Sequence, residues 1–163
     1  MKYWPHWASH YPLLIKVMQI TSGDVLELGM GMASTPLLHW LCFDTGRNLI
    51  SYENNKKYYD MHIRFHKDWH KIHFVEDWNK IDIIKPWSVA LVDHSPARRR
   101  REDLKKLANC SQFVIIHDTQ PEDNRFYRYE RIWPMYKYRY DYTKDKPWTS
   151  VVSNFVNLQE VLK

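Results

Sequence analysis

The chain has 163 residues, with 24 Lys and Arg against 19 Asp and Glu and a formal net charge of +5. This length predicts a single domain over residues 1–163, with a sizeable core and little room for a separate substrate domain. No run of about 18 apolar residues occurs and the start lacks an apolar leader stretch, so we expect neither a membrane span nor a signal peptide.

The cysteine positions and the charge indicate what kind of protein this is and which partners it could bind. Cys42 and Cys110 stand far apart and fit reduced thiols of a cytoplasmic protein better than a disulfide framework or a zinc site. The positive charge, together with 8 Trp and 11 Tyr, is compatible with nucleic acid as a partner. Because the charge is spread along the chain, a basic surface around an aromatic core is the favoured interpretation.

The N-terminal segment, residues 1–12, is rich in aromatic residues and histidine and is broken by two prolines. Its irregular pattern predicts neither a helix nor a strand. We expect it either to cover a ligand site as an N-terminal lid or to pack on the outside of the sheet. Apolar residues at helical spacing over 13–20 then predict a helix that ends before Gly23.

A glycine turn follows a short apolar strand over 24–28, and a helix starts almost at once. Gly29 and Gly31 allow a sharp turn and the close approach of a ligand to the backbone. Ser34 or Thr35 is expected to cap the helix. The first N–H groups of such a helix point at whatever lies over the turn, which is how open α/β sheets bind nucleotide-like cofactors.

The ligand of this turn is not expected to be a dinucleotide. Ser34 replaces the third glycine of G-x-G-x-x-G, and no Lys or Arg between residues 24 and 46 could contact a diphosphate. Glu27 precedes the turn, and an acidic loop suits a cationic ligand with an amino-acid tail. The run Glu27-x-Gly29-x-Gly31, followed by a small hydroxyl residue, resembles the first motif of class I S-adenosylmethionine (AdoMet) methyltransferases.

The remaining elements support this resemblance. Strands are expected over 48–53, 71–76, 87–93 and 112–119, and helices over 36–43, 55–69, 97–107 and 124–133. Alternating tyrosines over 136–142, a turn, and a strand over 148–155 predict an antiparallel pair. The resemblance covers about residues 13–157. It implies a Rossmann-like α/β sheet of five parallel strands with helices on both faces, followed by the antiparallel pair.

Polar residues end one strand after another, and ligands of open α/β sheets bind beyond these carboxyl ends. Glu53 follows Gly31 by about 20 residues, which is typical of an acid that binds ribose, although it could instead cap the next helix. The resemblance implies that Asp77 contacts adenine and that Trp78 offers a stacking face; capping of a turn at 79–84 is the alternative for Asp77. The cofactor-binding set is therefore Glu27, Gly29, Gly31, Ser34, Glu53, Asp77, Trp78 and Asp93.

Asp93 and Asp118 end neighbouring strands, which lie about 4.8 Å apart in a sheet. Two adjacent carboxylates require a shared cation, a raised pKa or nearby donors. The strand-end acids resemble those of small-molecule O-methyltransferases of the divalent-metal type, which implies that Asp93 and Asp118 hold an ion such as Mg²⁺. Thr119 stands where those families have a third ligand, which argues against the metal.

Without a metal, a histidine is expected to act as base. His94 is the first choice because it follows Asp93, and the two together are expected to face the reacting centre. His117 is the second choice, because strand alternation places it on the opposite face from Asp118.

The helix over 97–107 begins with a run of arginines. Arg98 with Glu102 and Arg99 with Asp103 have the spacing of i,i+4 ion pairs on one solvated face. A site for an anionic substrate is the alternative for this run.

The expected function is AdoMet-dependent methyl transfer to a small hydroxylated molecule. A nucleic-acid methyltransferase and a non-catalytic AdoMet-binding or partner domain are the alternatives. Whether the chain forms a homodimer stays open.

Overall fold

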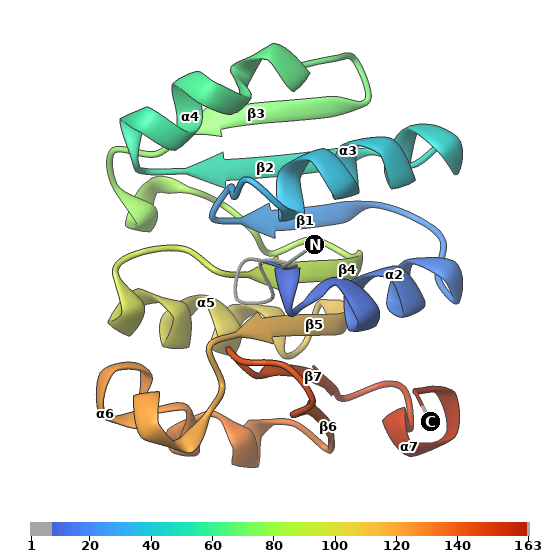
Figure 1. Ribbon diagram of the computed structural model, residues 1–163, viewed down its shortest axis with the longest axis vertical. Coiled ribbons are helices and arrows are strands. Elements are labelled where there is room, and N and C mark those ends of the chain that lie inside the picture. The colour runs from blue at the N-terminus through green and yellow to red at the C-terminus, as the bar shows by residue number, and fades with distance from the viewer. Residues whose placement is uncertain (1–7, 163) are drawn as a thin grey trace, which may run out of the picture.

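The computed structural model describes residues 8–162 of the chain. Within this range, seven strands form one sheet in the order β3-β2-β1-β4-β5-β7-β6 (Figure 1). Neighbours among β1 to β5 are parallel, whereas β7 runs antiparallel to both β5 and β6. The expected sheet of five parallel strands and a terminal antiparallel pair is thereby confirmed. The strands are β1 Val25–Leu28, β2 Leu49–Glu53, β3 His70–Phe74, β4 Trp87–Val92, β5 Ser111–His117, β6 Tyr138–Tyr142 and β7 Thr149–Ser153.

Helices cover both faces of the sheet and bury two apolar layers against it (Figure 1). On one face α2, α3 and α7 pack on alternate residues of the central strands. On the other face α5 packs with the short helices η2, η5 and η6. The α-helices are α2 Tyr11–Gln19, α3 Ser34–Asp44, α4 Lys56–His62, α5 Arg100–Leu107, α6 Asn124–Tyr127 and α7 Leu158–Val161. The 3₁₀ helices are η1 Ile63–Phe65, η2 Trp78–Lys80, η3 Ala97–Arg99, η4 Pro121–Asp123, η5 Tyr129–Arg131 and η6 Trp133–Met135.

Two expected helices are shorter than the pattern indicated. The helix expected over 55–69 ends at His62 and continues only as η1. The helix expected over 124–133 stops at Tyr127, because Arg128 adopts a left-handed conformation with φ 51°. The chain then continues as η5 and η6, two single turns.

The glycine turn differs from the expectation in how its residues are used. The helix α3 begins at Ser34 without a side-chain cap from the described residues. The Thr35 hydroxyl instead donates to Glu27 Oε1 at 3.0 Å. Gly29 has φ +93°, and a Cβ there would lie 2.5 Å from the backbone nitrogen of His94. Gly29 is therefore required by the tight approach of the chain that leaves β4.

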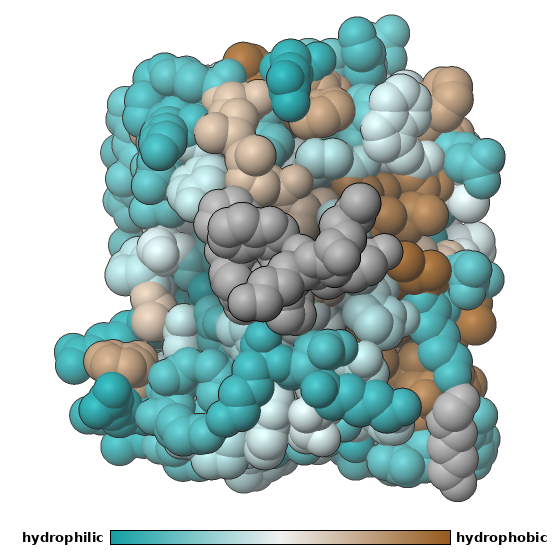
Figure 2. Space-filling view, viewed as in Figure 1, coloured by the Kyte–Doolittle hydropathy of each residue, from teal (hydrophilic) through white to brown (hydrophobic). Residues whose placement is uncertain are grey.

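The surface that carries α2 and α3 is mostly hydrophilic, and hydrophobic residues gather beside these two helices (Figure 2). Phe43, near the end of α3, has 60 % of its surface exposed. Among the residues described here, no helix is long and apolar enough to cross a bilayer.

Candidate functional site

A cavity of about 570 Å³ opens at the carboxyl ends of the parallel strands. It lies beside β1 and β4, the neighbours at which the strand order reverses, where open α/β sheets bind their ligands. Its walls come from five parts of the chain that are distant in sequence. These are residues 30–34 of the glycine turn, 53–56 and Tyr58 at and after the end of β2, 93–95 after β4, His117 of β5, and His10.

Glu53 joins the glycine turn to the end of β2. Its carboxylate accepts the backbone N–H of Met30 at 2.7 Å and that of Asn55 at 2.6 Å. Burial raises the pKa of Glu53, although these backbone donors act against the shift. The side chain lies in the cavity wall, so the expected strand-end acid stands where a ligand can reach it. The neighbouring Asn54 also lines the cavity, and its buried Oδ1 has no hydrogen-bond partner within the described chain.

Glu27 lies behind the glycine turn and outside the described wall of the cavity. It is fully buried under α3 and accepts hydrogen bonds from Thr35 at 3.0 Å and Ser51 at 2.6 Å. The Thr35 hydroxyl in turn accepts the Gly31 N–H at 3.1 Å. Glu27 therefore acts on the turn through Thr35, whereas Gly31 and Ser34 border the cavity directly.

Asp77 and Trp78 are used in the connection after β3 and are not part of the described cavity wall. Asp77 caps η2 by accepting the Asn79 N–H at 2.9 Å, which is the alternative role considered for it. The Trp78 indole is buried and donates to the Ser95 carbonyl at 2.9 Å. Its ring packs against His94, with centroids 4.2 Å apart.

His94, the first candidate for a base, is held inside the protein. Its Nε2 lies 3.0 Å from Asp103 Oδ2, and both side chains are fully buried. Burial lowers the pKa of His94, although the contact with Asp103 acts in the opposite direction. This contact places the Nε2 of His94 against Asp103 of α5, although His94 also lines the cavity. The i,i+4 pair of Arg99 and Asp103 forms as expected, at 2.9 Å, but Asp103 is buried and does not lie on a solvated face.

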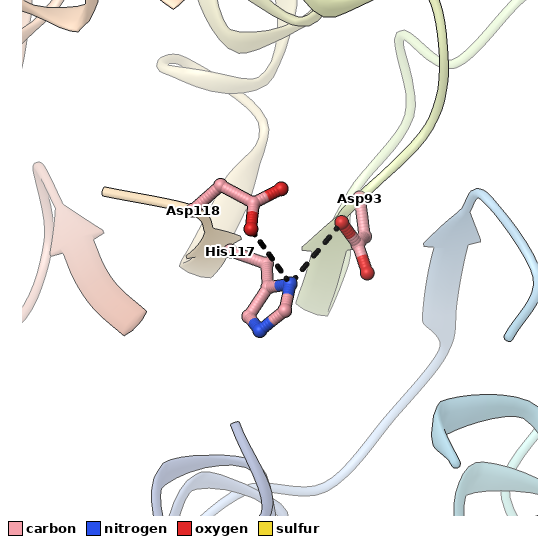
Figure 3. A group of neighbouring side chains, drawn as sticks. All are labelled: Asp93, His117 and Asp118. Atoms are coloured by element: carbon pink, nitrogen blue, oxygen red, sulfur yellow. Dashed lines mark ion pairs between the residues drawn. The ribbon is translucent and has the colours of Figure 1, made fainter. Parts of the chain in front are cut away.

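His117 lies between the two strand-end acids (Figure 3). Its Nδ1 is 3.4 Å from Asp93 Oδ1 and 3.5 Å from Asp118 Oδ1, and its Nε2 is 3.0 Å from the Ser9 hydroxyl. Burial opposes protonation, but the contacts with Asp93 and Asp118 together outweigh it and raise the pKa of His117. The expectation that His117 and Asp118 face opposite sides is wrong, because Asp118 has φ 59° and leaves the strand alternation.

Arg100 is a residue of this site that the sequence pattern did not single out. It is 4 % exposed, and its Nη2 donates to Asp93 Oδ1 at 2.9 Å while its Nη1 donates to Asp118 Oδ2 at 3.2 Å. Burial acts against ionisation of Asp93, yet Arg100, with His117 and His10, lowers the pKa of this acid to about 2. The arginine run offers no sequence signal for this role, because four identical side chains stand together.

The two acids expected to hold a divalent ion are thus brought together, and His117 completes a group of three close ligand atoms. However, the guanidinium of Arg100 already bonds to both carboxylates, and Tyr127 donates to Asp118 Oδ2 at 2.8 Å. The two carboxylates therefore fit the Arg100 guanidinium as their cation, and they do not fit a divalent metal ion in addition to it.

The part of the expected lid that the structure describes borders the cavity. His10 lines it, and the His10 ring meets the ring of His117 edge-on at 5.2 Å. The Tyr11 hydroxyl donates to the Ala33 carbonyl at 2.8 Å, which fastens the start of α2 to the glycine turn. Residues 1–7 of the expected lid lie outside the described residues.

No family model matches the chain, and no curated protein matches it. Solved structures do. The O-methyltransferase from Bacillus cereus in complex with S-adenosylhomocysteine has a TM-score of 0.63 at 13% identity, with 93% of this chain and 82% of that chain covered. The N-terminal domain of human METTL16 in complex with the same ligand has a TM-score of 0.60 at 10% identity, with 96% and 73% covered.

TrmK from M. capricolum, also in complex with S-adenosylhomocysteine, has a TM-score of 0.57 at 13% identity. The match covers 86% of this chain but only 66% of TrmK. At sequence identities this low, the structural similarity establishes the fold and does not identify the methyl acceptor. Together with the strand order and the cavity at its switch point, it shows that the chain has the Rossmann-like fold of class I AdoMet-dependent methyltransferases.

Proposed function

We propose that the chain is an AdoMet-dependent methyltransferase that acts on a small hydroxylated molecule. The observation that carries this proposal is the Glu53 carboxylate in the wall of the cavity, held by the Met30 and Asn55 N–H groups at 2.7 Å and 2.6 Å. A fixed acid at the end of the second strand is what a ribose diol requires as an acceptor.

The chain's own groups fit such a ligand. Glu53 would accept hydrogen bonds from ribose hydroxyls, and the unpartnered Oδ1 of Asn54 would accept one from a nearby N–H or O–H of the nucleoside. The turn over 30–34 would hold the amino-acid end, supported from behind by Glu27 through Thr35. Trp78 would support the wall, because its indole donates to the carbonyl of Ser95, whereas Asp77 caps η2 through the Asn79 N–H.

The reacting centre would lie beside Asp93 and His117, both in the cavity wall. When bound, AdoMet would supply an activated methyl group on a positively charged sulfur. The acceptor oxygen would form a C–O bond to that methyl carbon as the C–S bond breaks, and S-adenosylhomocysteine would leave. The chain aligns the acceptor, which can account for much of the rate in a displacement of this kind. His117 is better placed than His94 to receive the acceptor's proton, because His94 is turned toward Asp103.

Calorimetry with AdoMet and with S-adenosylhomocysteine tests the cofactor site. Glu53→Gln replaces one acceptor oxygen by an amide that faces a backbone N–H, so affinity is expected to fall at least about tenfold, or about 1.4 kcal/mol. Glu122→Gln is the matched control, since Glu122 is exposed and pairs with Lys146. Unchanged affinity in Glu53→Gln, or no binding by the parent chain, would remove the basis of the proposal.

A nucleic-acid acceptor is the second candidate, favoured by the net charge of +5. Binding to oligonucleotides would then fall steeply with added salt, whereas binding of a small acceptor would change little. A non-catalytic domain would bind AdoMet without turning it over with acceptors of either class.

A further inference from the structure

The cluster of Asp93, His117 and Asp118 at the ends of β4 and β5 contains a positively charged side chain. The Arg100 guanidinium comes from α5 and lies between the Asp93 and Asp118 carboxylates, with contacts of 2.9 Å and 3.2 Å. It also donates to the His94 carbonyl at 2.7 Å and to the His117 carbonyl at 3.2 Å. One side chain therefore binds the acid and the backbone of both strand exits.

Most of the metal-ligating atoms of this cluster already have a partner. Asp93 Oδ1 contacts Arg100 and lies near His117 Nδ1, and Asp118 Oδ2 accepts from Arg100 and Tyr127. Asp118 Oδ1 is the atom near His117 Nδ1, at 3.5 Å. An imidazole nitrogen between two carboxylates is placed as an N–H donor, and a protonated nitrogen does not ligate a metal.

The charges of this cluster also argue against a bound divalent ion. Two carboxylates and one guanidinium leave the group with one excess negative charge when His117 is neutral. A divalent ion among these oxygens would lie within a few ångströms of the guanidinium, which is buried and therefore little screened by water. The Tyr127 ring supports the guanidinium from one side, with its centroid 4.7 Å away, so the arginine has little freedom to move aside.

We propose that Arg100 is a built-in cation that takes the place of a divalent metal between Asp93 and Asp118. The chain then binds no divalent ion at these acids. Arg100 acts as a positioning residue that keeps Asp93 in the cavity wall and ties the β4 and β5 exits together. That methyl transfer proceeds without an added metal rests on the proposed function, whereas the binding statement does not.

Manganese binding, followed by electron paramagnetic resonance, tests the binding statement without any activity assay. Mn²⁺ accepts carboxylate and imidazole ligands, so it probes this donor set. The parent chain and Asp118→Asn are expected to behave alike, with no saturable site below about 1 mM. Arg100→Ala removes the cation between the two carboxylates, so it is expected to bind Mn²⁺ at least about tenfold more tightly than the parent chain.

Two further variants locate the effect. Arg100→Lys keeps a positive charge and is expected to lack the manganese site. Asp118→Asn combined with Arg100→Ala is expected to lose the site that Arg100→Ala gains. Circular dichroism and thermal melting establish which variants are folded.

A saturable Mn²⁺ site in the parent chain that Asp118→Asn removes would overturn the proposal, and so would a folded Arg100→Ala that binds no better than the parent. If Arg100→Ala does not fold, the comparison of the parent chain with Asp118→Asn decides. AdoMet binding is measured separately in metal-free buffer. A chain that fails to bind AdoMet would sink the proposed function and leave the manganese result standing.

Discussion

Glu27→Gln is expected to make the protein more stable at mildly alkaline pH. Glu27 has no exposed surface, and it lies between β2 and α3, where it accepts from Ser51 and Thr35. Burial raises the pKa of Glu27 from its ordinary 4.5 to about 7. Glutamine has nearly the same shape and can keep both contacts, because each hydroxyl can donate or accept.

The size of the effect follows from linkage between protonation and folding. The two pKa values, 4.5 and about 7, differ by an amount worth roughly 3 kcal/mol at about 1.4 kcal/mol per pKa unit. The folded state holds the proton more tightly than the unfolded state. The stabilisation from Glu27 is therefore fully present below 4.5 and is lost as the pH rises through about 7.

Urea unfolding at several pH values measures this directly. The gain of Glu27→Gln over the parent chain should approach about 3 kcal/mol near pH 8 and should mostly disappear by about pH 5. Glu102→Gln is the control, because Glu102 is exposed and pairs with Lys105, and it should show no such pH trend. A Glu27→Gln difference that is independent of pH would refute the reasoning, since the buried carboxylate would then titrate as it does in the unfolded chain.

Two substitutions probe the fold itself. Gly29→Ala is expected to destabilise the chain far more than Gly46→Ala: both positions have positive φ, but only at Gly29 would the added Cβ meet backbone, at 2.5 Å. Comparable melting temperatures for the two variants would contradict this reading of the turn. Tyr136→Phe removes a buried hydroxyl that donates to the Leu104 carbonyl at 2.7 Å, and urea unfolding should show a loss of about 0.5 to 1.5 kcal/mol, because the carbonyl keeps the Ala108 N–H at 3.1 Å. An unchanged stability would mean that the Ala108 N–H alone is sufficient for this carbonyl.

The sheet could be predicted because each strand carries its own local pattern. The apolar runs that became β1, β4 and β5 indicate strands buried on both faces, and the alternating tyrosines of β6 indicate one exposed face. The helix ends could not be predicted as well. The left-handed residue that ends α6 is Arg128, a residue type that gives no stop signal.

The cofactor side of the candidate site follows from sequence more readily than the reacting side. Glu53 and the glycine turn lie at the ends of β2 and β1, so chain position alone places them in the cavity wall. Asn54, directly after Glu53, could have been found by the same rule. The roles of Asp93, His94 and His117 depend instead on which groups face them across the fold, and that information is not local.

The helix α5 supplies much of that missing information. Its Asp103 draws His94 into the core at 3.0 Å, and its Arg100 holds Asp93 at 2.9 Å. The adjacent residues Asp93 and His94 therefore contact different partners, and both partners belong to α5. A sequence pattern shows these helix residues only as charges at i,i+4 spacing, which is equally typical of a solvated face. Burial decides between the two readings, because a carboxylate or guanidinium removed from water must be paired, and its partner then fixes what the neighbouring strand end can do.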